Sequence, residues 1–366
     1  MSRLQANYRT TSANLEDIFR RAETFLGELG PKDKVALIHD SDPDGICSAT
    51  VLLRSMKNLG MEPNLIIASS PDGVKRDGVL VKGFNKIIIL DLAPHLYTKS
   101  LEEGIKSGIS FLIFDHHMVY EMNSEKIYYV NPRLFESTIY MPTSYLVFKY
   151  YQRLFDTKDL EWIAAIGTVA DYGIKRETED LLTKFLTKKD YEDVWKSEFG
   201  KAAIKLNASI SILGAKKCLQ VMLKLKSFEK FNKVAEFKKA ADKFESELKK
   251  RQAEVRRKAE VHAKEGLVIS FVETKFDHIA STISSMMSRE EKYKGMTFLL
   301  FEKKGDVYKI HGRSQEGRVD IGRLFEKLGI GGGHVQAGGA SIDASELPKF
   351  KNLLIKEIGR ISRLKG

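Results

Sequence analysis

Hydrophobic runs alternate with amphipathic or turn-rich segments through the first part of the chain. The runs are rich in β-branched and aromatic residues, and they occupy residues 34–40, 63–69, 86–92, 109–115 and 126–131. Such alternation predicts βαβ units whose strands form a mainly parallel sheet covered by helices. The fold class expected for this part is therefore α/β.

The pattern becomes helical after residue 140 and strand-like again after residue 266. Residues 140–188 have helical character, and apolar residues recur at helical spacing on a charged background within 228–264. This second pattern predicts a long, mostly exposed connecting helix. The runs at 266–274 and 296–314 predict strands, with a hairpin turn at the KKGD segment, and a helix follows at 321–328. We expect a smaller α+β domain here.

The length of the chain predicts more than one domain. Its 366 residues are more than one ordinary hydrophobic core needs. We place an N-terminal parallel-sheet domain at residues 1–190, a helical connector at 191–265 and the smaller domain at 266–366.

Positive charge is concentrated in one segment. The formal net charge is +11, and residues 201–266 contain 18 Lys and Arg against 8 Asp and Glu, which gives 18 − 8 = +10. A basic stretch attracts polyanions and makes their binding salt-dependent. A solvated helix face rich in Lys and Glu has the same composition. Both interpretations stay open.

The remaining composition indicates a cellular setting. Cys47 and Cys218 show no zinc-knuckle or disulfide spacing, which fits a reducing compartment. The first residues lack the apolar region of a signal peptide, and no apolar run approaches the ~20 residues of a membrane helix. We expect a cytoplasmic protein without membrane association.

Three of the predicted strands end in an aspartate. Asp40, Asp91 and Asp115 each follow an apolar run. The carboxyl ends of parallel strands meet at one edge of the sheet, where reactive groups gather. Three carboxylates in one crevice repel each other unless a cation is present. The pattern therefore predicts a cation site at this edge.

The segment HDSDPDG, residues 39–45, carries further candidate ligands. It places His39, Asp40, Asp42 and Asp44 directly after the first strand. Alternate aspartates can aim at one point and suit hard divalent cations. An acidic turn with helix-capping aspartates has the same sequence features.

Histidines and one more aspartate follow later in the chain. The FDHH segment adds His116 and His117, and neutral imidazole is a common ligand of manganese, iron and zinc. Asp171 follows the apolar run of IGTVADYG. Taken singly, each has an ordinary alternative: a hydrogen-bonded loop pair for the histidines, and a helix-end loop residue for the aspartate.

The chain thus carries four motifs in order: the HDSDPDG segment, Asp91, the FDHH segment and Asp171. Together, they resemble the motifs of the DHH phosphoesterases in type and order along residues 34–175. This family includes RecJ exonucleases, nanoRNases, exopolyphosphatases and manganese pyrophosphatases. The resemblance implies two divalent cations bridged by Asp91, usually Mn²⁺, with Mg²⁺ or Co²⁺ as substitutes. Asp42 would bind one cation, and the other would be bound by Asp44, His116 and Asp171.

The resemblance also implies roles around the cations. Asp115 would orient His116, and His117 would contact the scissile phosphate, so that Asp91, Asp115 and His117 form the catalytic set. Relatives have a single His or Asp two residues before the first ligand. Here that position is Asp40 and His39 precedes it, so either residue can complete the first metal site.

The segment HGRSQEGRVDIGRLFEKLGIGGGHVQAGG, residues 311–339, is a candidate anion site. Its composition indicates a glycine-rich loop whose backbone amides can cradle a phosphate, and the alternative is a flexible turn. GRS, a helix and GGGHxxAGG in this order resemble the DHH-associated C-terminal domain over about 266–345. The resemblance implies substrate binding by the following residues: Arg313, Ser314, Gly331, Gly332, Gly333 and His334.

We therefore expect a two-metal phosphodiesterase that hydrolyses single-stranded DNA or RNA, or short oligonucleotides, to nucleoside 5′-monophosphates. In such sites two cations acidify a shared water and stabilise both the attacking and leaving oxygens. The alternatives are a cyclic-dinucleotide or pApA phosphodiesterase, and a RecJ-related structural subunit of a replication complex; inorganic pyrophosphatase fits less well. Replication or repair proteins are possible partners, and a homodimer is a further possibility.

Overall fold

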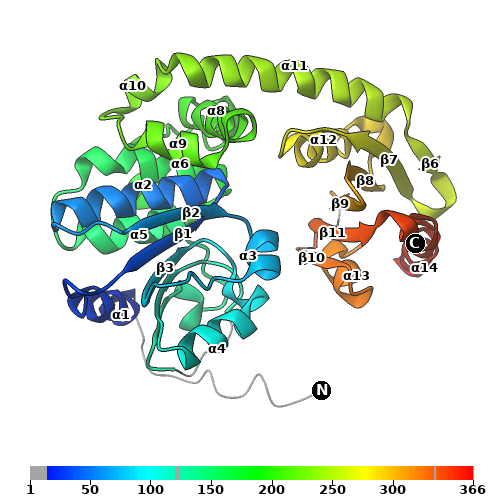
Figure 1. Ribbon diagram of the computed structural model, residues 1–366. Coiled ribbons are helices and arrows are strands. Elements are labelled where there is room, and N and C mark those ends of the chain that lie inside the picture. The colour runs from blue at the N-terminus through cyan, green and yellow to red at the C-terminus, as the bar shows by residue number, and fades with distance from the viewer. Residues whose placement is uncertain (1–14, 120–123, 316, 334, 366) are drawn as a thin grey trace. The chain divides into compact units, whose positions relative to one another are not determined.

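The chain forms two compact units, residues 1–238 and 239–366 (Figure 1). The computed structural model describes residues 15–119, 124–315, 317–333 and 335–365. The predicted α/β class with a second, smaller α+β domain is confirmed. The boundaries placed at 190 and 265 stay a prediction.

The first unit is built on a five-stranded parallel sheet with strand order β2-β1-β3-β4-β5. Its strands lie where the hydrophobic runs predicted them: β1 (Val35–Asp40), β2 (Leu65–Ser69), β3 (Lys86–Leu90), β4 (Ser110–Phe114) and β5 (Ile127–Val130). The helices of the unit are α1 (Leu15–Gly27), α2 (Pro43–Asn58), α3 (Pro71–Asp77), α4 (Thr98–Lys106), α5 (Thr143–Gln152), α6 (Glu161–Ala170), α7 (Glu179–Leu182), α8 (Glu198–Leu213), α9 (Ala215–Met222) and α10 (Phe228–Asn232).

Helices cover both faces of this sheet, and alternate strand residues supply the two cores. On β1, Val35 and Leu37 join the larger core with α1, α2, α5, α6 and α8. Ala36 and Ile38 face the smaller core with α3 and α4 (Figure 1). Burial on both faces explains why these strands are nearly continuous apolar runs.

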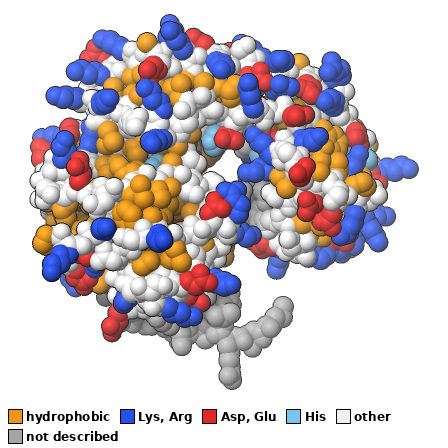
Figure 2. Space-filling model, viewed as in Figure 1, with side chains coloured by type: hydrophobic (Ala, Val, Ile, Leu, Met, Phe, Trp, Pro, Cys, Tyr) orange, Lys and Arg blue, Asp and Glu red, His pale blue; other side chains and the backbone are white. Residues whose placement is uncertain are grey.

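A long helix, α11 (Ala235–Arg257), starts at the end of the first unit and continues into the second. It is mostly exposed, as its charged background predicts. Ion pairs at helical spacing neutralise several of its cations, among them Lys249 with Glu245 and Arg251 with Glu247. Figure 2 shows basic and acidic side chains interspersed over the visible surface. This mixture is typical of a solvated helix face.

The second unit has a six-stranded mixed sheet with order β10-β11-β9-β8-β7-β6, in which only β7 and β8 run parallel. Its strands are β6 (Glu260–His262), β7 (Leu267–Glu273), β8 (Thr297–Lys304), β9 (Val307–Ser314), β10 (Gly331–Gly333) and β11 (Ala337–Asp343). The predicted hairpin joins β8 to β9, and Gly305 at its turn has a φ of 61°.

Three helices pack on this sheet: α12 (Ile279–Met287), α13 (Ile321–Lys327) and α14 (Leu347–Lys365). Helices α13 and α14 cover the face of the sheet that presents Leu299, Phe301 and Ile310. On β9, Arg313 alternates with these inward positions and contacts α12 instead. Among the described residues, no helix combines the length and the apolar character that a membrane crossing needs.

Candidate metal centre

The aspartates at the strand ends meet at the carboxyl edge of the first unit's sheet. Asp40 is the last residue of β1, and Asp91 and Asp115 follow β3 and β4. All three are buried. Asp91 has a φ of 64°, a conformation that non-glycine residues seldom adopt, and its amide donates to the Phe114 carbonyl oxygen at 3.0 Å. Strained backbone of this kind clusters at functional sites.

The turn into α2 adds two more carboxylates. Asp42 caps the helix by accepting a hydrogen bond from the Gly45 amide at 2.8 Å. A side chain at Gly45 would lie 2.3 Å from the Asp40 carbonyl oxygen, so this tight turn requires glycine. Asp44 is buried and accepts from the amides of Thr143 and Ser144, at 2.7 and 3.1 Å, at the start of α5.

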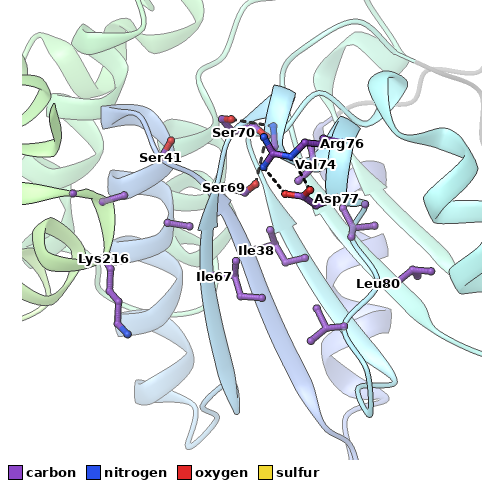
Figure 3. Close-up of a pocket in the computed structure, with 17 residues that line it drawn as sticks. Ile38, Ser41, Ile67, Ser69, Ser70, Val74, Arg76, Asp77, Leu80 and Lys216 are labelled. Carbon is purple, nitrogen blue, oxygen red and sulfur yellow. Dashed lines mark hydrogen bonds and ion pairs between the residues drawn. The ribbon is translucent and has the colours of Figure 1, made fainter. Parts of the chain in front are cut away.

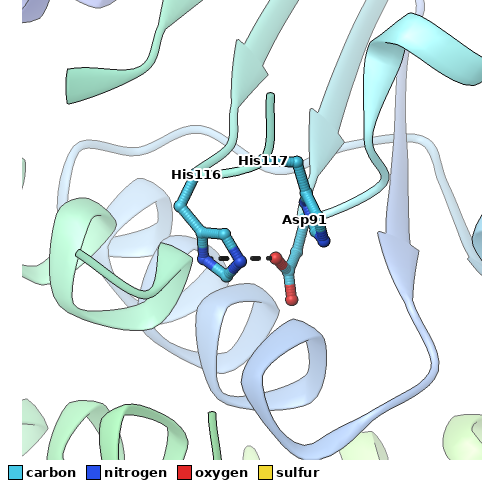
Figure 4. A group of neighbouring side chains, drawn as sticks. All are labelled: Asp91, His116 and His117. Carbon is cyan, nitrogen blue, oxygen red and sulfur yellow. Dashed lines mark ion pairs between the residues drawn. The ribbon is translucent and has the colours of Figure 1, made fainter. Parts of the chain in front are cut away.

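His116 lies among these carboxylates. Its Nε2 is 3.4 Å from Asp171 Oδ2, and its Nδ1 is 3.9 Å from Asp44 Oδ2 and 3.8 Å from Asp91 Oδ1. Figure 4 shows the side chains of His116 and Asp91 directed toward each other. Asp171, which follows α6, is thereby joined to residues from three other segments of the chain.

Among the described residues, three groups of side chains could each hold a cation. Within each group the candidate ligand atoms lie within 4.8 Å of one another. The groups are Asp40, Asp42 and Asp91; Asp44, His116 and Asp171; and Asp91, His116 and His117. Asp91 is grouped both with Asp40 and Asp42 and with His116, and His116 also belongs to the group that contains Asp44 and Asp171.

The electrostatics of the cluster favour cation binding. Burial raises the pKa of Asp91 well above its usual range, and the charges of Asp44 and Asp42 raise it further. Burial and neighbouring carboxylates likewise raise the pKa of Asp40 and Asp171, and they raise that of Asp44 to about 7. Carboxylates held this close are costly to ionise without a compensating charge. Divalent cations with oxygen and imidazole ligands would supply that charge.

Asp115 is hydrogen-bonded to His117, and its expected role in orienting His116 stays a prediction. Its Oδ1 is 2.8 Å from His117 Nδ1, and its Oδ2 accepts from the His117 amide at 3.0 Å. Burial alone would raise the pKa of Asp115, but the charge and hydrogen bonds of His117 outweigh it and lower that pKa. Asp115 in turn raises the pKa of His117 to about 9, against the opposing effect of burial. Asp115 therefore holds the partly exposed His117 ring in place beside the cluster.

His39 is separated from the candidate ligands. It is buried, its Nδ1 lies 2.7 Å from the Asp40 carbonyl oxygen, and burial lowers its pKa to about 4. Among the described residues it joins none of the three metal-binding groups, whereas Asp40 joins one of them. Successive strand residues point to opposite faces, and which of the two residues completes the first metal site stays a prediction.

Sequence reasoning missed the residues that hold these ligands in place. The Thr143 hydroxyl donates to Asp91 Oδ1 at 2.9 Å while its amide binds Asp44, so one residue positions both carboxylates. Tyr140 donates to Asp171 Oδ2 at 2.6 Å. The PTS segment, residues 142–144, is a recognisable helix start. Tyr140 carries no comparable signal.

A cavity of about 670 Å³ lies at the carboxyl ends of β1 and β2 (Figure 3). Ile38, Ile67 and Val74 supply apolar surface, Lys216 supplies positive charge, and Arg76 is ion-paired with Asp77, which also lines the cavity. Its lining also includes Ser41, which lies between Asp40 and Asp42 in the chain. The cavity therefore places a mixed apolar and charged surface next to the candidate metal-binding loop.

In the second unit, Arg313 and Ser314 already have partners within the protein. Arg313 donates to the hydroxyls of Ser285 and Ser281, at 2.9 and 3.1 Å. Ser314 is buried, and its hydroxyl accepts from the Val319 amide at 3.3 Å. These contacts fix the chain after β9, and a role of either residue in substrate binding stays a prediction.

The glycine cluster forms a strand, whereas composition indicated a loop. Gly331 to Gly333 are β10, an edge strand paired antiparallel with β11. A side chain at Gly331 would lie 2.1 Å from the Gly339 carbonyl oxygen, and Gly333 has a φ of 142°. Close strand pairing therefore requires these glycines. His334, the last predicted substrate-binding residue, lies outside the described residues.

Comparison with known protein families matches the two halves of the molecule separately. Residues 34–174 match the DHH family, N-terminal domain, and residues 264–360 match the DHHA1 domain. The chain belongs to the DHH phosphoesterase family. The first match contains every residue of the three metal-binding groups, and the second contains β10 and Arg313. The DHH chain has no match among curated proteins.

Solved structures share this DHH fold. RecJ from Thermus thermophilus in complex with Mn²⁺ is 16% identical with a TM-score of 0.70; the alignment covers 94% of this chain and 55% of that one. An exonuclease RecJ bound to manganese has the same identity and TM-score, and the alignment covers 96% of this chain and 97% of that one. CDC45 from Entamoeba histolytica is 12% identical, with a TM-score of 0.52 and 94% and 97% covered. The chain thus spans about half the length of the Thermus RecJ.

Proposed function

We propose that this protein is a manganese-dependent phosphodiesterase that hydrolyses single-stranded DNA or RNA, or short oligonucleotides, to nucleoside 5′-monophosphates. The observation that carries the proposal is the sharing of Asp91 between two groups of candidate ligands at one edge of the sheet. The resemblance to RecJ structures that bind manganese supports the choice of metal.

The residues divide between two cations. Asp40 and Asp42 would hold one cation, and Asp44, His116 and Asp171 would hold the other. Asp91, which is grouped with Asp40 and Asp42 and lies 3.8 Å from His116 Nδ1, would contribute to both. His39 takes no part in this assignment. When bound, two cations acidify a water and neutralise charge on the phosphoryl group.

His117 supplies positive charge toward the phosphate. Its hydrogen bond to Asp115 holds the ring, and Asp115 raises the pKa of His117 to about 9. A protonated imidazole can donate a hydrogen bond to a phosphate oxygen and stabilise the charge that develops there. Arg313 and the edge amides of β10 in the second unit bind the terminal nucleotide in this proposal.

A structural role in a replication complex is the second candidate, because CDC45 has a related fold. The buried carboxylates of the candidate groups favour an enzyme over a purely structural protein, since bound cations would offset the energetic cost of their burial. Catalysis and partner binding are compatible in one chain.

Product analysis distinguishes these functions. End-labelled single-stranded DNA and RNA of graded length, a cyclic dinucleotide and pyrophosphate are each incubated with the protein and Mn²⁺. We expect metal-dependent release of mononucleotides from the linear strands. Cleavage restricted to the cyclic dinucleotide or to pyrophosphate would assign a different substrate, and saturable metal binding without hydrolysis of any of them would favour the structural role.

A further inference from the structure

Tyr172 is an exposed aromatic residue that directly follows the candidate metal ligand Asp171. Its exposed fraction is 57%, yet its φ is 54°, a conformation in which bulky residues are rare. Backbone hydrogen bonds fix this turn: the Tyr172 amide donates to the Val169 carbonyl at 3.2 Å, and that of Gly173 donates to the Thr168 carbonyl at 2.8 Å. The strain is therefore retained without burial of the side chain. Such outliers cluster at ligand-binding sites.

A second aromatic residue supports the tyrosine ring. The centroid of Trp195 lies 5.0 Å from that of Tyr172, with an angle of 71° between the planes. Trp195 is partly buried against the main core of the first unit. This edge-to-face contact restricts the tyrosine ring while more than half of the residue stays exposed.

Two exposed cations follow the ring closely in the sequence. Lys175 and Arg176 are exposed and follow Tyr172 within four residues. Exposed aromatic rings next to cations are typical of surfaces that bind unpaired strands, since every base has a face that can stack. Consecutive Cα atoms are ~3.8 Å apart, so Tyr172 lies one residue from a ligand of the metal centre. Pyrophosphate and polyphosphate have no group that could use such a ring.

We propose that Tyr172, held by Trp195, stacks against the nucleobase of a nucleotide next to the phosphate at the metal centre. The inference rests on the proposed function and narrows it, because it selects substrates with unpaired bases over inorganic phosphates. Tyr172 is a binding residue in this account, and Trp195 is a positioning residue.

The test combines variants of Tyr172 with oligonucleotides that lack one base. Oligothymidylate and a series with a single abasic residue at each position near the cleaved end are digested by wild type, Y172F, Y172A and Y191A. Tyr191 is the matched control, because it is an exposed tyrosine of the same unit outside the metal centre. We expect Y172A to raise KM for oligothymidylate roughly 5- to 100-fold, and Y172F and Y191A to stay close to wild type.

The abasic series identifies the interaction that is lost. Removal of one particular base should weaken cleavage by wild type and have no further effect in Y172A, because the stacking partner is already absent. Equal losses in both proteins at every position, or unchanged cleavage by Y172A, would overturn the inference while leaving the proposed function intact. Failure of wild type to cleave any oligonucleotide would overturn both.

A glycine variant separates binding from a structural role. Y172G removes the ring and its contact with Trp195 but relieves the strained φ, so its unfolding temperature should stay close to that of wild type. Its KM for oligothymidylate should rise as in Y172A. A lower unfolding temperature with an unchanged KM would assign the ring to stability and contradict the proposal.

Discussion

Asp91 in the first unit and Arg313 in the second are both candidate binding residues, but their surroundings differ. Asp91 is buried beside other carboxylates that raise its pKa, and the Thr143 hydroxyl donates to its side chain. Arg313 donates to two serine hydroxyls and a carbonyl. A bound cation would relieve the repulsion between carboxylates at the first site. At the second site, substrate binding would replace hydrogen bonds that Arg313 makes within the protein. Binding at the two sites should therefore respond differently to mutation and pH.

Substitution of Asp91 should have the largest effect. We expect D91N to lower Mn²⁺-dependent hydrolysis by more than about 100-fold, because even residues that only orient metal ligands contribute ~10–100-fold. D156N is the matched control, since Asp156 is an exposed aspartate of the same unit. Initial rates at saturating Mn²⁺ measure the effect, and equal rates for the two variants would remove Asp91 from the centre.

Stabilisation of the protein by Mn²⁺ should depend strongly on pH. The pKa of Asp44 is raised to about 7, so without metal this carboxyl stabilises the fold at low pH, and that contribution is lost as the pH rises through 7. Mn²⁺ must displace the proton, and its apparent affinity should fall up to about tenfold per pH unit below 7 for each proton displaced. The rise in unfolding temperature caused by Mn²⁺ should thus be larger at pH 8 than at pH 5.5. An equal rise at both pH values would show that these carboxyls do not bind the metal.

Substitution of Thr143 should have an intermediate effect on Mn²⁺ affinity. T143V removes the hydroxyl that donates to Asp91 but keeps the amide that binds Asp44. A loss of roughly 10-fold in Mn²⁺ affinity follows from the usual contribution of a residue that orients a ligand. T138V, at an exposed threonine, is the control. Titration of both variants with Mn²⁺ measures the difference, and equal affinities would contradict the positioning role.

Substitution of Arg313 should have the smallest effect, and it should change substrate binding without changing metal binding. R313A should raise KM for an oligonucleotide by about 10-fold, in the range of a lost hydrogen bond to a charged group, and should leave Mn²⁺ affinity unchanged. R323A, at an exposed arginine of α13, is the matched control. A change in Mn²⁺ affinity with an unchanged KM would reverse the proposed division between the units.

Most of the first unit's fold was predictable from sequence because its strands are buried on both faces. Residues such as Ile87 to Leu90 then form continuous apolar runs. The aspartate at the end of each run, such as Asp91, is then recognisable as a residue at the end of a strand. The gathering of Asp40, Asp91 and Asp115 at one edge follows from parallel strand direction alone. Asp171 required the family resemblance, since a single aspartate after a helix carries little signal.

Other details depended on tertiary contacts that no local pattern records. The distinction between His39 and Asp40 is set by strand geometry at the sheet edge, and the pairing of Asp115 with His117 by the turn after β4. The glycine cluster formed a strand because β11 packs against it closely, which composition cannot show. Tyr140 lies far from Asp171 in sequence, so only the fold brings them together.

The central claim is that one carboxylate, Asp91, joins two cations in the first unit. Titration of metal-stripped wild-type protein with Mn²⁺ in a calorimeter counts the ions bound per chain, and D91N is titrated beside it. The account predicts two ions for wild type and the loss of tight binding in D91N. Absence of saturable binding in wild type, or identical binding in the two proteins, would contradict it.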